Sequence, residues 1–324
     1  MMEAKMLTDS VNVYGHRART FRLRYPKFIH SEFMTHRVLS RNASSSRAVP
    51  TAKLLEEVRS DALRAGPVWW GKNQPGMQAA EELDDSDRRY VGYFGEVISS
   101  RARAEEFWRS AAMDAVKWAQ ALNEFSVHKQ IVNRVLEPYS HINVVATGTD
   151  WENFFGLRLH KDAQPEMRAL AEAMWRAQGD STPTLLRRGE WHLPFIDDET
   201  QDEVVRLICS TTDSVMDIYQ TLIKVSVARC GRVSYTSFET GKRSTVEEDL
   251  AMYARRLFLP EPDGPPLRGV PIHASPAEHQ LTPDRKTGQQ YIIGYLDDTE
   301  ANPIWADGWH YGHQHGNGDR VEAI

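Results

Sequence analysis

The longest stretch that is typical of a single regular element lies between Asp87 and Phe125. It contains no proline, and from Val97 onward its apolar residues recur at three- and four-residue spacing. This period places the apolar residues on one side of an α-helix. The spacing predicts a long, mostly buried helix with Trp108 and Trp118 in the core. Because this one helix takes up a large share of the chain, we expect the protein to be rich in helices.

Other segments predict further helices and few strands. Alternating apolar and polar residues are typical of strands, and three-four spacing is typical of helices. We expect strands at Phe21–Tyr25 and Ile142–Thr147, and helices over Phe28–Leu39, Ala52–Ala65, Gln164–Gln178, Thr200–Arg229 and Val246–Leu257. Helices dominate, so the expected fold class is α+β, with a small central sheet that is mixed or antiparallel.

Composition excludes several classes of protein. The chain has 324 residues and a net charge of −6, which argues against a stable nucleic-acid partner. It contains no apolar run long enough to span a bilayer, so no membrane partner is expected. Its two cysteines cannot form a disulfide framework, and its first residues lack the apolar stretch of a signal peptide. These features together predict a cytoplasmic protein.

The densest polar segment is Thr35–Arg47. It holds three arginines, one histidine, one asparagine and four serines within thirteen residues. Guanidinium groups, hydroxyls and amides are suited to phosphates and to the edges of heterocycles. Taken alone, the segment is equally consistent with a capped helix end followed by a solvated serine loop.

Three motifs at family spacing favour the functional interpretation. Thr35–Arg47 resembles the signature R-H-R-x-x-S-x-N-E-x-S-x-R of flavin-dependent thymidylate synthases and matches six of its eight fixed positions. It departs from the signature at Thr35, where the family has arginine, and at Ala43, where the family has glutamate. Residues 133–138 resemble the family's A-R-x-x-L-P, and residues 153–168 resemble its N-x-x-x-L-R-x-x-x-H-A-Q-x-E-I-R, with Asp162 in place of the histidine.

Two further resemblances occur out of order. The family begins with an A-R-V-S-Y-like strand, followed by a helix and S-P-F-E-H. Residues 230–235 and 273–279 look like those elements here, but they follow the rest of the matched chain. A circular permutation is the simplest account, and it predicts that Ser275–His279 lies beside the strand at Phe21–Tyr25. The expected organisation is therefore one catalytic domain over residues 1–282, of which 228–282 resemble the family's N-terminal part, and a C-terminal extension of unknown role over residues 283–324.

The resemblance implies roles for particular residues. Those expected to bind FAD are His36, Arg37, Ser40, Asn42, Asn153, Ser234 and His279. Those expected to bind the substrate nucleotide are Glu32, Ser45, Arg47, Arg134 and Arg158. Arg158 is also the expected catalytic residue, because a fixed guanidinium against a pyrimidine carbonyl stabilises charge that develops in the ring.

The implied reaction is methylation of dUMP at C5 to give dTMP. The family uses methylenetetrahydrofolate as carbon donor and NADPH as reductant, and forms a homotetramer with sites at subunit interfaces. Neither Cys209 nor Cys230 lies in the context of a nucleophile, which suits a flavin route. The terminal histidines His310, His313 and His315 lack the pattern of metal ligands, so no metal is expected.

Two alternatives remain open at this point. Ala43 removes a carboxylate that the family places beside the nucleotide, so a related enzyme that methylates or hydroxymethylates dCMP or dUMP is the first. A non-catalytic homologue that binds nucleotides or nucleic acid through the same basic segment is the second.

Overall fold

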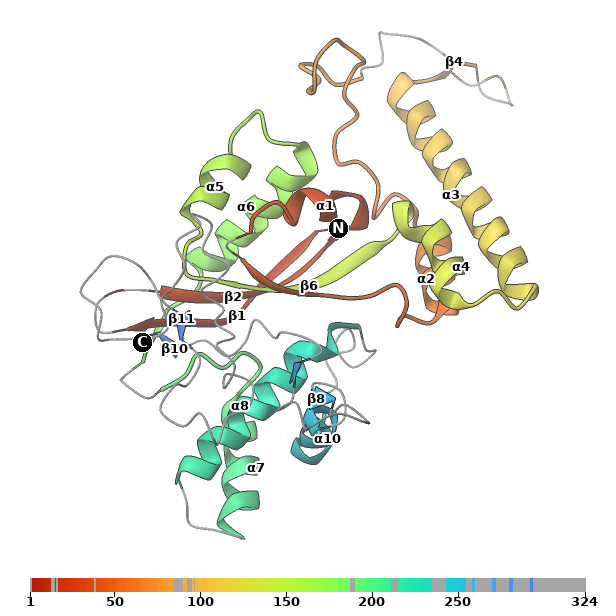
Figure 1. Ribbon diagram of the computed structural model, residues 1–324. Coiled ribbons are helices and arrows are strands. Elements are labelled where there is room, and N and C mark those ends of the chain that lie inside the picture. The colour runs from red at the N-terminus through yellow and green to blue at the C-terminus, as the bar shows by residue number, and fades with distance from the viewer. Residues whose placement is uncertain are drawn as a thin grey trace.

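The computed structural model describes residues 2–254, apart from 13–14, 16, 38, 84–89, 92–94, 96, 187–189, 211–214 and 235–242. It also describes four two-residue strands at 258–259, 270–271, 280–281 and 292–293. A five-stranded sheet lies at its centre, with helices on both faces and at one end (Figure 1).

The sheet is mixed and has the strand order β3-β6-β2-β1-β7. Its strands are β1 (Glu3–Asn12), β2 (Arg17–Pro26), β3 (Ser40–Ala43), β6 (His141–Gly148) and β7 (Thr184–Leu186). All neighbours are antiparallel except β1 and β7. The expected α+β class is confirmed, as are the two expected strands, which lie within β2 and β6.

Helices make up most of the remaining structure. They are α1 (His30–Phe33), α2 (Thr51–Ser60), α3 (Ser100–Glu124), α4 (Lys129–Leu136), α5 (Glu152–Arg158), α6 (Pro165–Gly179), α7 (Asp198–Cys209), α8 (Val215–Gly231) and α10 (Val246–Met252). Short 3-10 helices are η1 (Lys27–Ile29), η2 (Glu137–Tyr139) and η3 (Arg232–Ser234). Small strand pairs are β4 (Tyr90–Val91) with β5 (Val97–Ile98), β8 (Phe258–Leu259) with β9 (Val270–Pro271), and β10 (Gln280–Leu281) with β11 (Ile292–Ile293).

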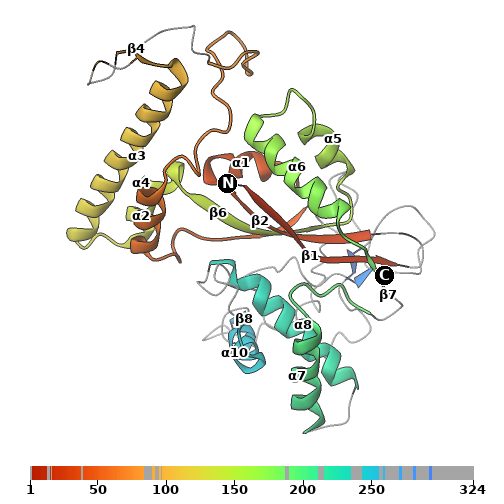
Figure 2. The ribbon, with the colours of Figure 1, turned by 180° about the vertical axis from the view of Figure 1, so that it is seen from behind.

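The two faces of the sheet bury different side chains. On one face Phe21, Leu23 and Val144 pack with Trp151 and with α5 and α6. On the other face Val145 packs against the end of α8 and η3. Figures 1 and 2 show α5 and α6 on one side of the sheet and α7, α8 and α10 on the other. This division follows from strand geometry, since successive side chains point to opposite faces.

Several expected helices are shorter than their sequence pattern suggests. The helix expected over Phe28–Leu39 ends at Phe33, because the chain must turn to bring the next segment into β3. The helix expected from Ala52 ends at Ser60, where the following residue has extended backbone. The helix expected over 200–229 is two helices, α7 and α8, with the side chain of Ser210 capping the end of α7 through Leu207 O at 2.7 Å.

The long helix α3 is not mostly buried. Its core face consists of small residues that pack against α2 and α4, whereas Trp118 is 60% exposed and Phe125 is 85% exposed. Trp108 does pack inside, where its Nε1 donates to Ala62 O at 3.2 Å. The expectation for Trp118 was therefore wrong, because the apolar residues of this segment cover two sides of the helix rather than one. The helix also begins only at Ser100, after the β4–β5 pair.

The C-terminal segment differs from expectation as well. Residues 230–234 form the end of α8 and η3 rather than a strand. Helix α10 covers residues 246–252 of the helix expected over 246–257, and residues 255–257 lie outside the described part of the chain. Ser275–His279, whose position would test the permutation, lie outside the described residues. Within the described part of the chain, no helix has both the length and the apolar character needed to cross a membrane.

A buried chain of hydrogen bonds joins three strands of the sheet to the loop before α7. His192 is fully buried; its Nε2 lies 2.7 Å from Thr20 Oγ1 and its Nδ1 lies 2.9 Å from Ser10 Oγ. Thr20 in turn bonds Thr147 Oγ1 at 2.6 Å. Burial lowers the pKa of His192 to about 3, so the imidazole is neutral in the folded protein.

This shift predicts a loss of stability in acid. An unfolded histidine titrates near pH 6.5, so below this pH the unfolded chain binds a proton that folded His192 does not. We expect His192 to contribute a fall on the order of 3 kcal/mol in the free energy of unfolding between pH 6.5 and 4. Urea unfolding across this range should show a shallower pH dependence in His192→Gln than in wild type, and parallel curves would contradict the prediction.

Candidate functional site

The signature segment is fixed to one edge of the sheet. Its strand β3 pairs with β6 from Ser40, opposite Thr147, to Ala43, opposite Val144. Ser40 is buried and Ala43 is exposed, so the chain leaves the sheet edge at Ala43. The residues that follow, 44–49, form a loop beyond β3, and we call them the serine loop.

Arg158 lies at the C-terminal end of α5 and meets the start of the signature. Its Nε donates to His36 Nε2 at 2.8 Å, and its Nη1 forms an ion pair with Glu32. Its Nη2 lies 3.4 Å from Thr35 Oγ1, which itself donates to Glu32 O at 2.7 Å. Three residues at or just before the start of the signature therefore surround a guanidinium that lies more than 120 positions later in the chain.

The contact with Arg158 determines the protonation state of His36. Because the guanidinium can only donate, His36 Nε2 must accept and the ring must be neutral. Burial, assisted by the positive charges of Arg158 and Arg41, lowers the pKa of His36 to about 4. The ring also packs edge-on against Phe154, with centroids 4.8 Å apart. His36 is therefore a fixed, uncharged acceptor that orients Arg158.

Arg158 retains capacity to bind a ligand. A guanidinium has five N–H donors, and the contacts with His36, Glu32 and Thr35 use three of them. Its side chain is 17% exposed. The remaining donors are thus available in a fixed orientation, which is what electrostatic stabilisation of a developing oxyanion requires.

Further positive charge lines the rest of the segment. Arg37 and Arg47 are exposed, and neither guanidinium bonds any other residue that the structure describes. Arg134 is exposed on α4, directly after Asn133, which contacts the serine loop. The arrangement of free guanidiniums beside exposed Ser45 fits a phosphate-bearing ligand.

Helix α4 holds the serine loop in place. Asn133 is fully buried, and its Nδ2 donates to Ser46 O at 2.7 Å and to Val49 O at 3.0 Å. Lys129 Nζ donates to Ala48 O at 3.1 Å. On the side of β6, Ser44 N donates to Asn143 O at 2.8 Å. Four backbone groups of the loop are thus tied to the scaffold.

The C-terminal part of the chain also reaches the signature. Ser45 N donates to Ser234 Oγ at 2.8 Å, and Asn42 Nδ2 donates to Cys230 O at 3.3 Å. Ser234, which the resemblance assigns to the FAD site, therefore contacts Ser45, which the resemblance assigns to the nucleotide site. The expected strand character of this segment was wrong, because residues 230–234 are helical.

The remaining predicted residues are less closely gathered. Asn153 is exposed in the first turn of α5, and no described residue links it to the cluster around Arg158. His279 lies outside the described residues. Asp162 is an exposed residue in a turn, and its Oδ2 lies 3.5 Å from His160 Nδ1. It is not among the residues that contact Arg158 in the described part of the chain.

Sequence reasoning missed two members of the site. Arg41, at a variable signature position, donates to His36 O and lies half-buried behind it. Asn133 was only part of a motif, and nothing in its spacing indicated that it clamps the serine loop. Neither role could be recognised from the sequence, because each depends on which segments pack together in the folded chain. Among the described residues, no cluster of histidine, cysteine or acidic side chains could hold a metal ion.

Comparison with known proteins places this geometry in context. The family model described as thymidylate synthase complementing protein matches residues 9–184, more than half of the chain. No curated protein matches the sequence.

Solved structures with similar folds are distant. A UMP/dUMP methylase, PolB from Streptomyces cacaoi, bound with 5-Br UMP, is 20% identical, with a TM-score of 0.39 over 55% of this chain and 89% of that one. Flavin-dependent thymidylate synthase ThyX from Helicobacter pylori, complexed with FAD and dUMP, is 18% identical, with a TM-score of 0.33 over 50% of this chain and 68% of that one.

The clamp by Asn133 predicts a selective loss of stability. Asn133→Ala removes two buried hydrogen bonds and leaves two loop carbonyls without their donor, which should lower the free energy of unfolding by about 1–3 kcal/mol. Lys129→Ala is the matched control, because it removes one exposed bond to the same loop and should cost less than about 1 kcal/mol. Urea unfolding measures both, and equal losses would contradict the assignment of Asn133 as the clamp.

Proposed function

Because this chain belongs to the thymidylate synthase complementing protein family, a family of flavin-dependent methyltransferases, we propose that it methylates dUMP at C5 to give dTMP. The family match covers the signature, the serine loop and Arg158. FAD is the proposed cofactor, and methylenetetrahydrofolate and NADPH are the proposed co-substrates.

The observation that carries this proposal is the fixed guanidinium of Arg158. C5 of uracil is a weak nucleophile, and its reactivity rises when negative charge can develop on a ring carbonyl. A guanidinium held by Glu32, His36 and Thr35 pays little reorganisation cost when it stabilises that charge. Neutral His36 strengthens this role, since it accepts from Arg158 without adding a competing positive charge.

The donor set of the signature fits both the nucleotide and the flavin. Ser45, Arg47 and Arg134 would hold the nucleotide phosphate at the serine loop. Arg37, Ser40, Asn42, Asn153, Ser234 and His279, with His36, would line the flavin site. The chemistry of these donors fits the proposed ligands. The exposed guanidiniums of Arg37 and Arg47 bond no other described residue, as expected of groups whose partner is an anionic ligand. Bound flavin would supply the redox chemistry that delivers reducing equivalents to the transferred carbon.

A second candidate is favoured by the departure from the family signature at Ala43. Glu32 supplies a carboxylate beside Arg158, whereas Ala43 lacks one at the exposed end of β3. The exocyclic amine of cytosine is a hydrogen-bond donor at the position where uracil has an acceptor. An enzyme that methylates or hydroxymethylates dCMP is therefore the alternative activity. A non-catalytic nucleotide- or nucleic-acid-binding protein is the alternative of another class.

One series of measurements separates these possibilities. The purified protein, reconstituted with FAD if needed, should show flavin absorbance that changes when dUMP is added. With methylenetetrahydrofolate and NADPH it should then convert dUMP to a product 14 mass units heavier, the mass of one added CH₂. Arg158→Lys should keep the flavin and lower kcat about a hundredfold or more, because a point charge cannot reproduce the oriented fork.

The other outcomes favour the alternatives. Conversion of dCMP in preference to dUMP, or a hydroxymethylated product, would replace the proposed reaction by the first alternative. Protein that stays colourless after reconstitution, yet binds nucleic acid, would favour the non-catalytic homologue.

A homotetramer is the proposed assembly, and the exposed side of α3 supports it. Phe107, Trp118 and Phe125 are 56%, 60% and 85% exposed on one helix, and large apolar surfaces of this kind mark association sites. Trp118→Glu should shift the mass measured by light scattering towards smaller species. Leu157→Glu, which changes a residue 53% exposed on α5, is the matched control and should leave that mass unchanged. A monomeric wild-type protein would contradict the proposed assembly.

A further inference from the structure

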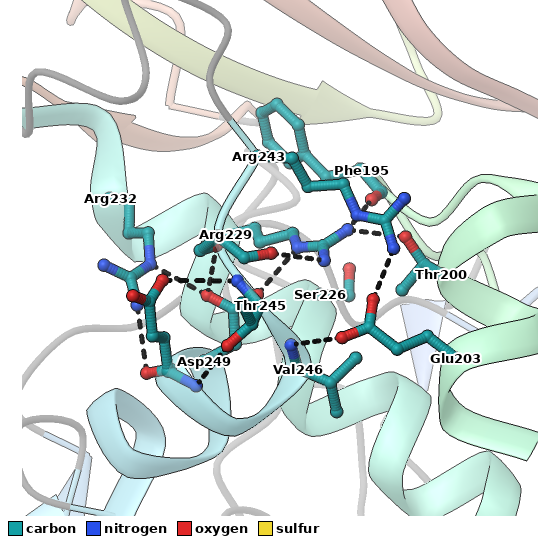
Figure 3. A network of polar contacts seen from close by, with 12 residues as sticks. Phe195, Thr200, Glu203, Ser226, Arg229, Arg232, Arg243, Thr245, Val246 and Asp249 are labelled. Atoms are coloured by element: carbon teal, nitrogen blue, oxygen red, sulfur yellow. Dashed lines mark hydrogen bonds and ion pairs between the residues drawn. The ribbon is translucent and has the colours of Figure 1, made fainter. Parts of the chain in front are cut away.

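A buried carboxylate in the C-terminal helices accepts bonds from three side chains. Asp249 is fully buried on α10; its Oδ2 accepts from Arg229 Nε at 2.8 Å, and its Oδ1 accepts from Arg232 Nε at 2.8 Å and from Ser244 Oγ at 2.6 Å (Figure 3). One negative charge is thus shared by two guanidiniums. Such a network is costly to bury, and it holds its members in a single arrangement only while every member is satisfied.

Arg229 and Arg232 serve different parts of the molecule. Arg229 is almost fully buried and ties α8 to α7, through Thr200 Oγ1 at 2.8 Å and Phe195 O at 2.7 Å. Arg232 instead begins η3, and its Nη2 donates to Glu248 O at 3.0 Å. The first arginine holds the helices to one another, whereas the second holds η3 to α10.

The 3-10 helix η3 is the element that touches the signature. Ser234, its last residue, accepts from the backbone N–H of Ser45, and Val233 packs with Val145 on the far side of the strand that pairs with β3. Cys230, just before η3, accepts from Asn42. The bonds from Arg232 to Asp249 and to Glu248 O therefore hold η3 to α10, in addition to the contacts that η3 makes with the signature and with β6.

We propose that Arg232 and Asp249 are positioning residues, which hold η3 so that Ser234 fixes the Ser45 amide and thereby the serine loop. The inference rests on the proposed function, because the serine loop is the proposed phosphate site. Neither residue touches a reacting group. Both lie beyond residue 184, where the family match ends, so this support comes from a part of the chain outside that match.

The clean variant is Arg232→Gln. It leaves Asp249 paired with Arg229 and Ser244, so the carboxylate is not stranded. The matched control is Arg243→Gln in the same group of helices. Arg243 bonds Glu203 at 2.5 Å and Glu199 at 2.6 Å, and neither contact reaches η3. Both variants lose an arginine that pairs with carboxylates, but only one of them loosens η3.

The first readout is amide hydrogen exchange over residues 42–47 in the ligand-free full chain. We expect exchange there to be about tenfold faster in Arg232→Gln and unchanged in Arg243→Gln, since opening of the loop needs only the local contact to break. Arg232→Lys, which keeps a positive charge beside Asp249, should restore slow exchange. Equal exchange in the two glutamine variants overturns the inference. It is equally overturned if exchange in Arg232→Gln rises to the same extent throughout α8 and α10.

The second readout is the dissociation constant of dUMP, measured by calorimetry. Arg232→Gln should bind dUMP about tenfold more weakly, while Arg243→Gln binds it as wild type does. Unchanged dUMP affinity in Arg232→Gln overturns the inference. Failure of wild type to bind dUMP overturns the proposed function instead, and the exchange experiment then still decides whether η3 positions the loop.

Discussion

The buried strand β6 is the constraint on which the rest of the structure depends. Every one of its residues from His141 to Gly148 is buried, and it pairs with β2 on one side and β3 on the other. A strand buried on both faces tolerates no change of register, because a slip of one residue would exchange its two sets of side chains. The strand therefore determines where β3 and the signature lie. It also determines where the chain enters α5, at whose far end Arg158 lies.

Charge in the site is arranged to orient donors without neutralising them. Arg158 is held by one carboxylate and by a histidine that burial keeps neutral, whereas the guanidiniums of Arg37 and Arg47 bond no other described residue. The protein is acidic as a whole, with a net charge of −6, yet the signature concentrates guanidiniums. A local cluster of guanidiniums on an acidic protein favours small anionic ligands over nucleic acid, because the repulsion from the remaining surface disfavours a long polyanion.

Two parts of the chain that are far apart in sequence both contact the signature and hold it in place. Within the family match, α4 holds the serine loop through Asn133. Beyond it, α8, η3 and α10 form a unit held by Asp249 and reach the loop through Ser234. A circular permutation keeps the contacts of a chain while it changes their order in the sequence. The permutation stays a prediction here, because Ser275–His279, whose position would test it, lie outside the described residues.

The sequence by itself determined the fold class, the strands within β2 and β6, and the residues of the signature, because hydrophobic period and motif spacing are local properties of the chain. It did not reveal β1 or β3, whose residues are mostly polar or small and become strands only by pairing with β2 and β6. It also placed Trp118 in the core, since periodicity shows which residues share a side of a helix but not which side is covered. Only the tertiary structure decided that Glu32, Thr35 and His36 surround Arg158 and that Asn133 and Ser234 hold the serine loop. Such contacts join residues 84 or more positions apart, and no local pattern encodes them.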